Sequence, residues 1–359
     1  MWPYWILFVV PALQAVSRLK QVQPLSGQRW SGVWCMVFLL LVLMIGLRHS
    51  VGGDWGSYSE NLASITNLSI AEVLARSKGD PGDSLLNWVA GESGLGIYLV
   101  NSVYATLFTW GLLVFCREQP RPWLALTIAV PYLITVVGMG YSRQGVAIGL
   151  IMLGLVALKN RSVFKFVLWV ALAATFHKSA VIMFPLAVLA GTRRRLLTLF
   201  WVGITTLILF VLMLQESVDA LLLNYVGAEY ESSGAAIRVA MNAFPALIFL
   251  LKRKRFEMVA AQRSFWTWMA WGSLAFVPLL YFSPSSTAVD RVALYWIPLQ
   301  LYVLSRLPDA FGLSCEGNAL WVYAVVGYSA TVHFVWLFFA AHAVYWLPYQ
   351  FYPWVWLWL

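Results

Sequence analysis

Five basic side chains stand at the ends of apolar segments, where they could bind an anion at the edge of a membrane. They are Arg48, Arg143, Lys178, Arg238 and Arg291. Guanidinium and ammonium groups bind phosphate well, and cations held near a bilayer tend to mark a functional site. We therefore expect a ring of cations that binds a phosphate or pyrophosphate group. The alternative for each is a long side chain that extends to the interface and only anchors its helix.

Three titratable side chains lie close in sequence to these cations and could accept a proton from a hydroxyl group. Asp54 follows the first cation by six residues, His177 directly precedes the third, and Asp290 directly precedes the last. A positioned carboxylate or imidazole can act as a general base. We rank the three candidates in that order. The alternative is a structural role, in which Asp54 only pairs with Arg48 and Asp290 only pairs with Arg291.

The stretch from Gly138 to Pro185 is the part around which we expect the site to form. It holds two apolar segments joined by a basic loop, with Arg143 at one outer end and His177 and Lys178 at the other. Each segment has about fifteen residues, which as a helix would span roughly 22 Å, against a hydrocarbon core of about 30 Å. The short length predicts that this shared end lies below the membrane surface.

Composition sets the class of protein. Hydrophobic residues make up 61% of the chain, charged residues only 11%, and mean hydropathy is +0.75. These values exclude an ordinary soluble domain and are typical of a membrane protein that crosses the bilayer several times. The net charge of +9 is explained by a cytoplasmic excess of basic residues, so we expect no nucleic-acid partner.

Hydropathy predicts an all-α polytopic integral membrane protein that forms a single transmembrane domain over residues 1–359. We expect about twelve transmembrane helices. Their predicted ranges are 3–17, 33–47, 95–116, 123–139, 144–158, 163–176, 179–191, 196–214, 237–251, 264–282, 292–305 and 319–341.

Two long loops are expected on the outer face, at about 48–94 and about 215–236. In the first, helical pieces are predicted at 57–66 and 70–77, with Ser57 and Ser69 as possible N-caps. The tryptophan-rich segment 345–359 is predicted to form an interfacial or re-entrant cap.

The distribution of basic residues predicts the orientation. Most of the 24 Lys and Arg residues fall in one set of loops, at about 18–29, 117–121, 159–165, 193–195, 252–263 and 306. Basic residues are enriched in cytoplasmic loops, so this set is predicted to be cytoplasmic. The five helix-end cations then lie on the outer face, together with most acidic residues.

Four short motifs occur in order along the chain. Residues 48–58 fit the pattern R-x-x-x-G-x-D-(Y/W)-x-x-Y, and residues 143–147 fit R-Q-x-x-A. The residues through Ala180 fit A-x-x-F-H-x-S-A, and residues 291–295 fit R-x-x-x-Y. Together they resemble the Wzy/EpsG family of bacterial O-antigen, capsule and exopolysaccharide polymerases.

The resemblance implies a glycosyltransferase of GT-C-like architecture in the bacterial cytoplasmic membrane, with its active site facing the periplasm or exterior. The implied substrate is an undecaprenyl-pyrophosphate-linked oligosaccharide, and the implied partners are the bilayer, a chain-length regulator and a flippase. The growing glycan would move from its lipid carrier onto the non-reducing end of the next repeat unit. The five cations would bind pyrophosphate, Trp55 and Tyr58 would stack on sugars, and the motifs add Gln144 and Tyr295 to the substrate-binding residues.

We expect neither a metal nor a cofactor. The four histidines show no H-x-x-x-H pair, the carboxylates show no D-x-D pair, and no phosphate-binding loop occurs.

Three other functions remain possible from the sequence. A lipid-linked oligosaccharide flippase would need charges along a path through the membrane and usually repeated halves, neither of which is seen. An O-antigen ligase would use the same donor but differs in its motifs. A scaffold subunit would leave the outward cations unexplained.

Overall fold

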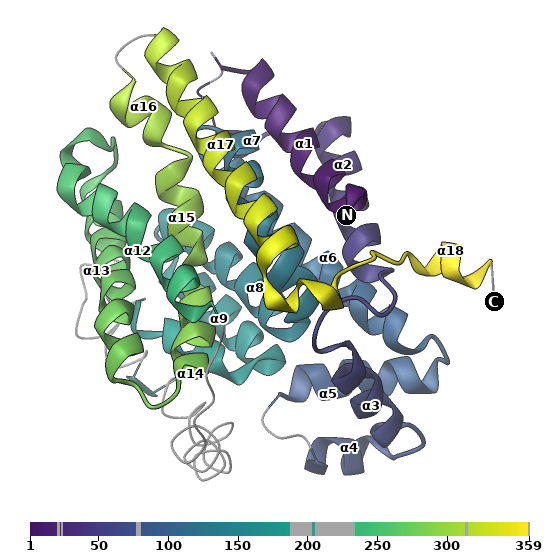
Figure 1. Cartoon of the computed structure of the whole chain (residues 1–359). Coiled ribbons are helices and arrows are strands. Elements are labelled where there is room, and N and C mark those ends of the chain that lie inside the picture. Colours follow the sequence, from purple (N-terminus) through teal and green to yellow (C-terminus); the bar gives the residue numbers. More distant parts are fainter. Residues whose placement is uncertain are drawn as a thin grey trace.

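The described part of the chain folds into a set of helices (Figure 1). The computed structural model describes residues 1–19, 22, 24–76, 80–186, 203–204, 234–312 and 315–357. Within these ranges there is no strand, only an isolated bridge between Arg48 and Phe351. The elements are α1 (Trp2–Ser17), α2 (Gly32–Gly46), α3 (Trp55–Ile65), α4 (Ile70–Arg76), α5 (Pro81–Glu92), α6 (Gly96–Arg117), α7 (Pro122–Ala129), the π-helix η1 (Val130–Gly138), α8 (Ser142–Lys159), α9 (Val163–Phe176), the 3₁₀-helix η2 (Lys178–Met183), α12 (Ala235–Lys252), η4 (Arg253–Arg255), α13 (Ala260–Phe282), α14 (Ser286–Ala293), η5 (Leu294–Trp296), α15 (Ile297–Leu304), α16 (Leu307–Phe311), α17 (Cys315–Phe339), η6 (Ala341–Tyr345) and α18 (Tyr352–Trp356).

Several helices are suited to a bilayer. In the described part of the chain, five are long and apolar enough to cross a membrane, namely Gly96–Arg117, Ser142–Lys159, Ala235–Arg255, Gln262–Phe282 and Asn318–Phe339. Shorter apolar helices run over Trp2–Ser17, Gly32–Gly46, Pro122–Gly138 and Val163–Phe176. The all-helical, multi-pass class predicted from hydropathy is therefore confirmed, whereas the count of twelve is not.

Three predicted spans differ from the structure or lie outside it. The span at 292–305 is instead a broken helix, because α14 passes through the 3₁₀ turn η5 before α15 begins. The span at 179–191 starts as the 3₁₀-helix η2, and its remainder is outside the described residues. The predicted span at 196–214 also lies outside them, except for residues 203–204, and so does most of the predicted loop at 215–236.

Helix α8 is the central helix and carries Arg143 in its first turn. It has 18 residues and would span about 27 Å, so it is longer than the sequence indicated, while the 14 residues of α9 span about 21 Å. Residues along the whole length of α8 are buried. Its backbone meets that of α6 where Gly149 faces Gly111, and a Cβ added at Gly111 would lie 1.9 Å from the Gly149 carbonyl oxygen. Small residues allow this close approach, which fixes the position of α8.

Contacts between loops join the helices at one end of the helical body. There, the Leu25 N–H donates to the Arg117 carbonyl at 2.8 Å, and Arg121 forms a 2.7 Å ion pair with Asp309. Lys159 pairs with Glu118 at the same end. These loops are the ones that the basic residues grouped together in the sequence.

Segment 54–92, which we call the outer segment because the sequence predicts it on the outer face, is more helical than predicted. Helices α3, α4 and α5 form a group at the lower right of Figure 1. The prediction of a cap at Ser57 is wrong, because α3 begins at Trp55. Ser69 does cap α4, where its hydroxyl and N–H both donate to Glu72. Helix α5 was not predicted, since Asp-Pro-Gly-Asp at 80–83 has the composition of a turn.

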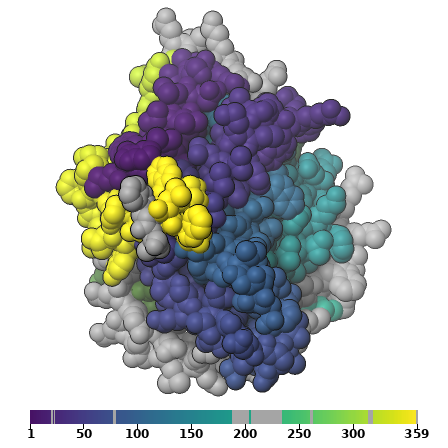
Figure 2. Space-filling model, turned by 90° about the vertical axis from the view of Figure 1, so that its right-hand side faces the viewer, coloured from purple at the N-terminus to yellow at the C-terminus, as the bar shows by residue number. Residues whose placement is uncertain are grey.

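The C-terminal segment returns to the start of this outer segment. The Tyr352 N–H donates to the Leu47 carbonyl at 2.8 Å, and the His49 N–H donates to the Gln350 carbonyl at 2.9 Å. Figure 2 shows these yellow C-terminal residues lying against the purple N-terminal part of the chain. The C-terminal segment therefore packs beside the end of α2, while its predicted interfacial or re-entrant position stays a prediction.

Candidate functional site

Arg143 occupies the first turn of α8 and faces the outer segment. Its Nη1 lies 3.3 Å from Asp80 Oδ2 and 3.4 Å from Asp83 Oδ2. Its guanidinium carbon lies 5.7 Å from the centre of the Tyr58 ring. The side chain is 37% exposed. Arg143 is thus oriented by neighbours on α3 and α5 but remains accessible to a ligand.

Asp80 connects the start of α5 to the end of α9. Its Oδ1 accepts a 2.8 Å hydrogen bond from the Lys178 backbone N–H, while Oδ2 faces Arg143. Burial raises the pKa of Asp80 to about 6, although the positive charge of Arg143 opposes the shift. The Asp80 carboxylate thus lies between a guanidinium and a backbone N–H group, which are both groups that can bind an anionic ligand.

Asp83 is more deeply buried than Asp80. Its Oδ1 accepts hydrogen bonds from the Tyr104 hydroxyl and, at 2.8 Å, from Asn87 Nδ2. Burial raises the pKa of Asp83, against the opposing charge of Arg143. Every contact that the structure gives this side chain comes from a donor, so its position is well determined.

Asp54 ends the loop before α3, and its backbone carbonyl accepts a 3.0 Å hydrogen bond from the Tyr58 N–H. Burial raises the pKa of Asp54, and the positive charges of Arg291 and Arg143 oppose this shift. Burial also raises the pKa of Tyr58 to about 12. Asp54 is a partly exposed carboxylate influenced by both arginines, and we find no ion pair for it within the described ranges.

His177 follows the last residue of α9 and is partly buried. Its Nδ1 is buried and has no hydrogen-bond partner. Burial lowers the pKa of His177 to about 3, and the charges of Arg143, Arg291 and Lys178 add to the effect. The imidazole is therefore neutral near pH 7 and a weak proton acceptor.

Arg291 reaches the same place from α14. Its backbone carbonyl accepts a 2.6 Å hydrogen bond from Gln144 Nε2, and its guanidinium carbon lies 5.6 Å from the centre of the Tyr141 ring. Nearby, the hydroxyls of Tyr295 and Ser179 are 2.9 Å apart. The four motifs identified in the sequence thus come from different parts of the chain and meet at one end of α8.

Comparison with known proteins decides the family. The family model described as "EpsG family" matches residues 32–351, which is nearly the whole chain. The chain belongs to the EpsG family. No curated protein and no solved structure gives a significant match. EpsG is a Wzy-type polymerase family, so the resemblance stated from the four motifs is confirmed. Membership gives a polysaccharide polymerase function of a general glycosyltransferase kind.

Arg48 has a buried position in this EpsG protein. It is 1% exposed and donates to the carbonyls of Ile45 at 2.5 Å and Val51 at 3.1 Å, and to the Ser142 hydroxyl at 2.7 Å. Burial lowers the pKa of Arg48 to about 10. The alternative role, in which Asp54 only pairs with Arg48, finds no support among these contacts. Arg48 instead joins the end of α2 to the start of α8, next to Arg143.

Trp55 lies over Arg48 and belongs to an aromatic group in this EpsG protein. The guanidinium carbon of Arg48 is 5.8 Å from the Trp55 ring centre, and the rings of His49 and Tyr98 lie 5.7 and 6.1 Å from Trp55. Trp55 therefore packs against the buried arginine with one part of its ring.

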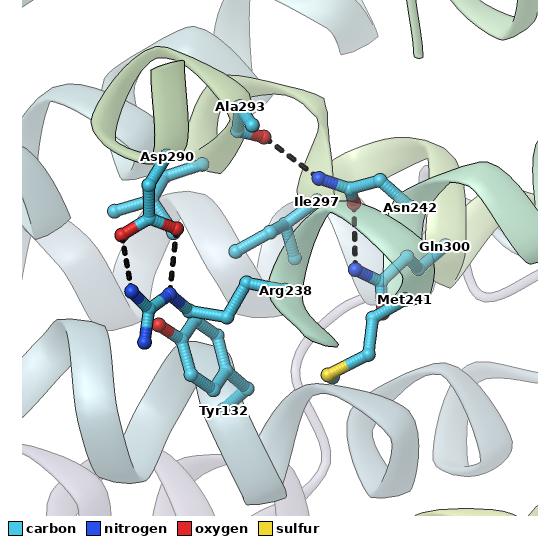
Figure 3. A pocket seen from close by; sticks show the side chains of 9 residues that line it. Tyr132, Arg238, Met241, Asn242, Asp290, Ala293, Ile297 and Gln300 are labelled. Atoms are coloured by element: carbon cyan, nitrogen blue, oxygen red, sulfur yellow. Dashed lines mark hydrogen bonds and ion pairs between the residues drawn. The ribbon is translucent and has the colours of Figure 1, made fainter. Parts of the chain in front are cut away.

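Asp290 and Arg238 form a pair of their own in this fold. Arg238 donates from Nε and Nη2 to the two carboxylate oxygens of Asp290, each at 2.6 Å (Figure 3). The alternative pairing with Arg291 is wrong: Asp290 pairs with Arg238. The pocket around this pair is too narrow to admit a water molecule. Beside this pair, Asn242 Nδ2 donates a hydrogen bond to the Ala293 carbonyl, and Asn242 Oδ1 accepts one from Gln300 Nε2.

Sequence reasoning missed Asp80 and Asp83, although they are the carboxylates in contact with Arg143. Their spacing of three residues places them on one face of a helix. The available signal was Pro81, which is favoured in the first turn of a helix and should have indicated that α5 begins there. Among the described residues no group of three or more His, Cys, Asp or Glu could hold a metal ion.

Proposed function

We propose that this EpsG protein polymerises lipid-linked repeat units at the outer leaflet of the bacterial cytoplasmic membrane. It would move a growing glycan from undecaprenyl pyrophosphate onto the non-reducing-end sugar of the next unit. The observation that carries the proposal is the convergence of Arg143, Lys178 and Arg291 with Asp54 at one end of α8. This arrangement suits an anionic leaving group beside a proton acceptor.

The cations would bind the pyrophosphate of the donor. Arg143 is exposed enough to reach a ligand, and Arg291 forms no ion pair with the described residues. The leaving group is stable as an anion, so charge neutralisation matters more than protonation. The backbone N–H of Lys178 would add a neutral donor once Asp80 no longer occupies it.

Asp54 is the preferred general base. The acceptor hydroxyl oxygen forms a bond to the anomeric carbon, and the bond from that carbon to the pyrophosphate oxygen breaks with its electron pair. The hydroxyl proton passes to the Asp54 carboxylate. Asp290 is less suited because both oxygens accept from Arg238, and His177 is less suited because its pKa is low.

The remaining residues have supporting places in this proposal. Tyr58 lies between Asp54 and Arg143 and could contact the sugar next to the pyrophosphate. Gln144 fixes Arg291 through its backbone, and Tyr295 fixes the segment that carries Lys178 through Ser179. Trp55 could present an edge of its ring to the glycan.

Loss of the gene provides the test. A deletion strain should make polysaccharide that collapses from a ladder of long chains to a single repeat unit, and a plasmid copy should restore the ladder. A plasmid copy carrying Arg291→Ala should not restore it. Complete loss of repeat units from the surface in the deletion strain would instead indicate a flippase or a ligase and would overturn the proposal.

A further inference from the structure

Arg143 is held at one nitrogen by two carboxylates that the family motifs do not include. Both ion pairs of this side chain use Nη1, at 3.3 Å to Asp80 and 3.4 Å to Asp83. No described residue accepts a hydrogen bond from Nε or Nη2 in this structure. The carboxylates therefore hold one corner of the guanidinium plane and leave the other donors for a ligand.

The two carboxylates are not equivalent. The Asp83 side chain is 6% exposed, and its other oxygen is bound by Tyr104 and Asn87. The Asp80 side chain is 14% exposed, and among the described residues its other oxygen is bound only by a backbone N–H from a different element. Asp83 is thus fixed by side chains on α6 and on its own helix, independently of the cation cluster.

The packing of α5 makes this arrangement rigid. Gly82 lies between the two carboxylates, and a Cβ added there would be 2.6 Å from Thr175 Oγ1. The absence of a side chain lets the first turn of α5 lie directly on the end of α9. The neighbouring first turn of α8 then presents Arg143 to Asp83.

We propose that Asp83, supported by Tyr104 and Asn87, is a positioning residue that sets the plane of the Arg143 guanidinium for pyrophosphate. The inference rests on the proposed function, since it assigns a role toward the same ligand. A planar fork binds a phosphate through two parallel hydrogen bonds only if it is held in the correct plane. A purely electrostatic effect of Asp83 would have the opposite sign, because a negative charge beside the site repels an anion.

The test measures the binding of undecaprenyl pyrophosphate to the purified full-length protein in lipid nanodiscs. Asp83→Asn should weaken binding about tenfold, and Arg143→Ala should weaken it more. Adding Asp83→Asn to Arg143→Ala should change binding by less than about twofold, because Asp83 acts through Arg143. Tyr104→Phe removes only the hydroxyl that bonds Asp83 and should weaken binding about threefold, again only when Arg143 is present.

Two control variants make the result specific. Asp80→Asn removes the same charge from the same nitrogen and should weaken binding less than Asp83→Asn does. Glu60→Gln removes a charge from an exposed position on α3 and should leave binding unchanged. If Asp83→Asn gives a protein that does not fold, Tyr104→Phe carries the test.

Three results would overturn the proposal. The first is ligand binding that is tighter or unchanged in both Asp83→Asn and Tyr104→Phe. The second is an equal loss of binding in Asp80→Asn and Asp83→Asn. The third is a full additional loss of binding when Asp83→Asn is added to Arg143→Ala. Normal binding with Arg143→Ala would remove the proposed pyrophosphate site itself. A loss with Arg143→Ala but not with Asp83→Asn would remove only the positioning role.

Discussion

Gln144 donates a 2.6 Å hydrogen bond to the backbone carbonyl of Arg291, a residue 147 positions later in the chain. The bond joins the first turn of α8 to α14, so the two arginines that follow from the family motifs are set at one end of the bundle. The bond uses the backbone of Arg291 and therefore leaves its guanidinium available. Gln144 thus helps to position Arg291 beside Arg143, although Gln144 itself carries no charge.

Replacing Arg143 tests whether it binds an anion through two contacts. Arg143→Ala and Arg143→Lys should both abolish long polymer while the protein remains in the membrane, because lysine keeps the charge but lacks the planar fork. Loss of such a contact to the leaving group should cost about 3 kcal/mol, or about a hundredfold in rate. The measurement is the polysaccharide ladder together with protein level. Arg76→Lys, at an exposed position of α4, is the control, and wild-type chain lengths from Arg143→Lys would favour an anchoring role.

Replacing Asp54 separates chemistry from folding. Asp54→Asn keeps the shape of the side chain but removes the proton acceptor, so protein level should be normal and chains should fall to short or single units. The rate in the wild type should decline as pH falls through the raised pKa of Asp54, since the base must be ionised. Full activity in Asp54→Asn would exclude Asp54 as the base and make His177→Gln the next variant.

Asp80 should contribute to the pH dependence of stability. Its pKa is about 6 when folded, against 3.8 ordinarily, so the folded state binds a proton more tightly than the unfolded state. The contribution is fully present below the unfolded pKa and is lost as pH rises through about 6. The melting temperature in detergent should therefore decrease as the pH rises from about 4 to 6 in the wild type, and it should decrease less in Asp80→Asn. Equal slopes for the two proteins would contradict this assignment.

The Arg238–Asp290 pair should act in folding. Asp290→Asn removes the carboxylate that accepts two hydrogen bonds from the largely buried Arg238 guanidinium, and breaking a buried pair costs about 3–5 kcal/mol. We expect less folded protein in the membrane, with partial recovery when Arg238→Asp is combined with Asp290→Arg. Size-exclusion chromatography of the solubilised protein measures this. A normal yield of Asp290→Asn that makes no polymer would instead support Asp290 as a catalytic residue.

Single cysteines introduced into a cysteine-free protein test the orientation. A cysteine replacing Lys254 should react with an impermeant maleimide only after the cells are opened, because loop 252–263 is predicted to be cytoplasmic. A cysteine replacing Glu60 should react in intact cells. Labelling of position 254 from outside would place the candidate site in the wrong compartment for an outer-leaflet reaction.

Hydropathy located most of the helices because apolar length is a property of local sequence, but it could not show where they break. The π-helix η1 and the 3₁₀ turn η5 lie inside apolar stretches that read as continuous. Asp290 shows a second limit. Its neighbour Arg291 was the obvious partner, yet adjacent residues on a helix point in different directions. The actual partner, Arg238, lies on α12 and is known only from the packing of α12 against α14.

Some of the site residues could be predicted from the sequence and others could not. The arginines on α8 and α14 could be predicted because helix-end charges in an apolar chain are conspicuous. Asp80 and Asp83 could not, because their meaning depends on α5 lying across the end of α9. The buried position of Arg48 was equally hidden, since the acceptors around it are two carbonyl oxygens and the Ser142 hydroxyl.

The hydrogen bonds between the two ends of the chain constrain the order of biosynthesis. Tyr4 donates to the Trp346 carbonyl, 342 positions away, and residues 47–52 bond to residues 345–352. Translation adds the segment with Arg48 and Asp54 long before it adds residues 345–352, which pack beside that segment. The part of the fold around Arg48 and Asp54 can therefore reach its final form only after residue 352 has been added.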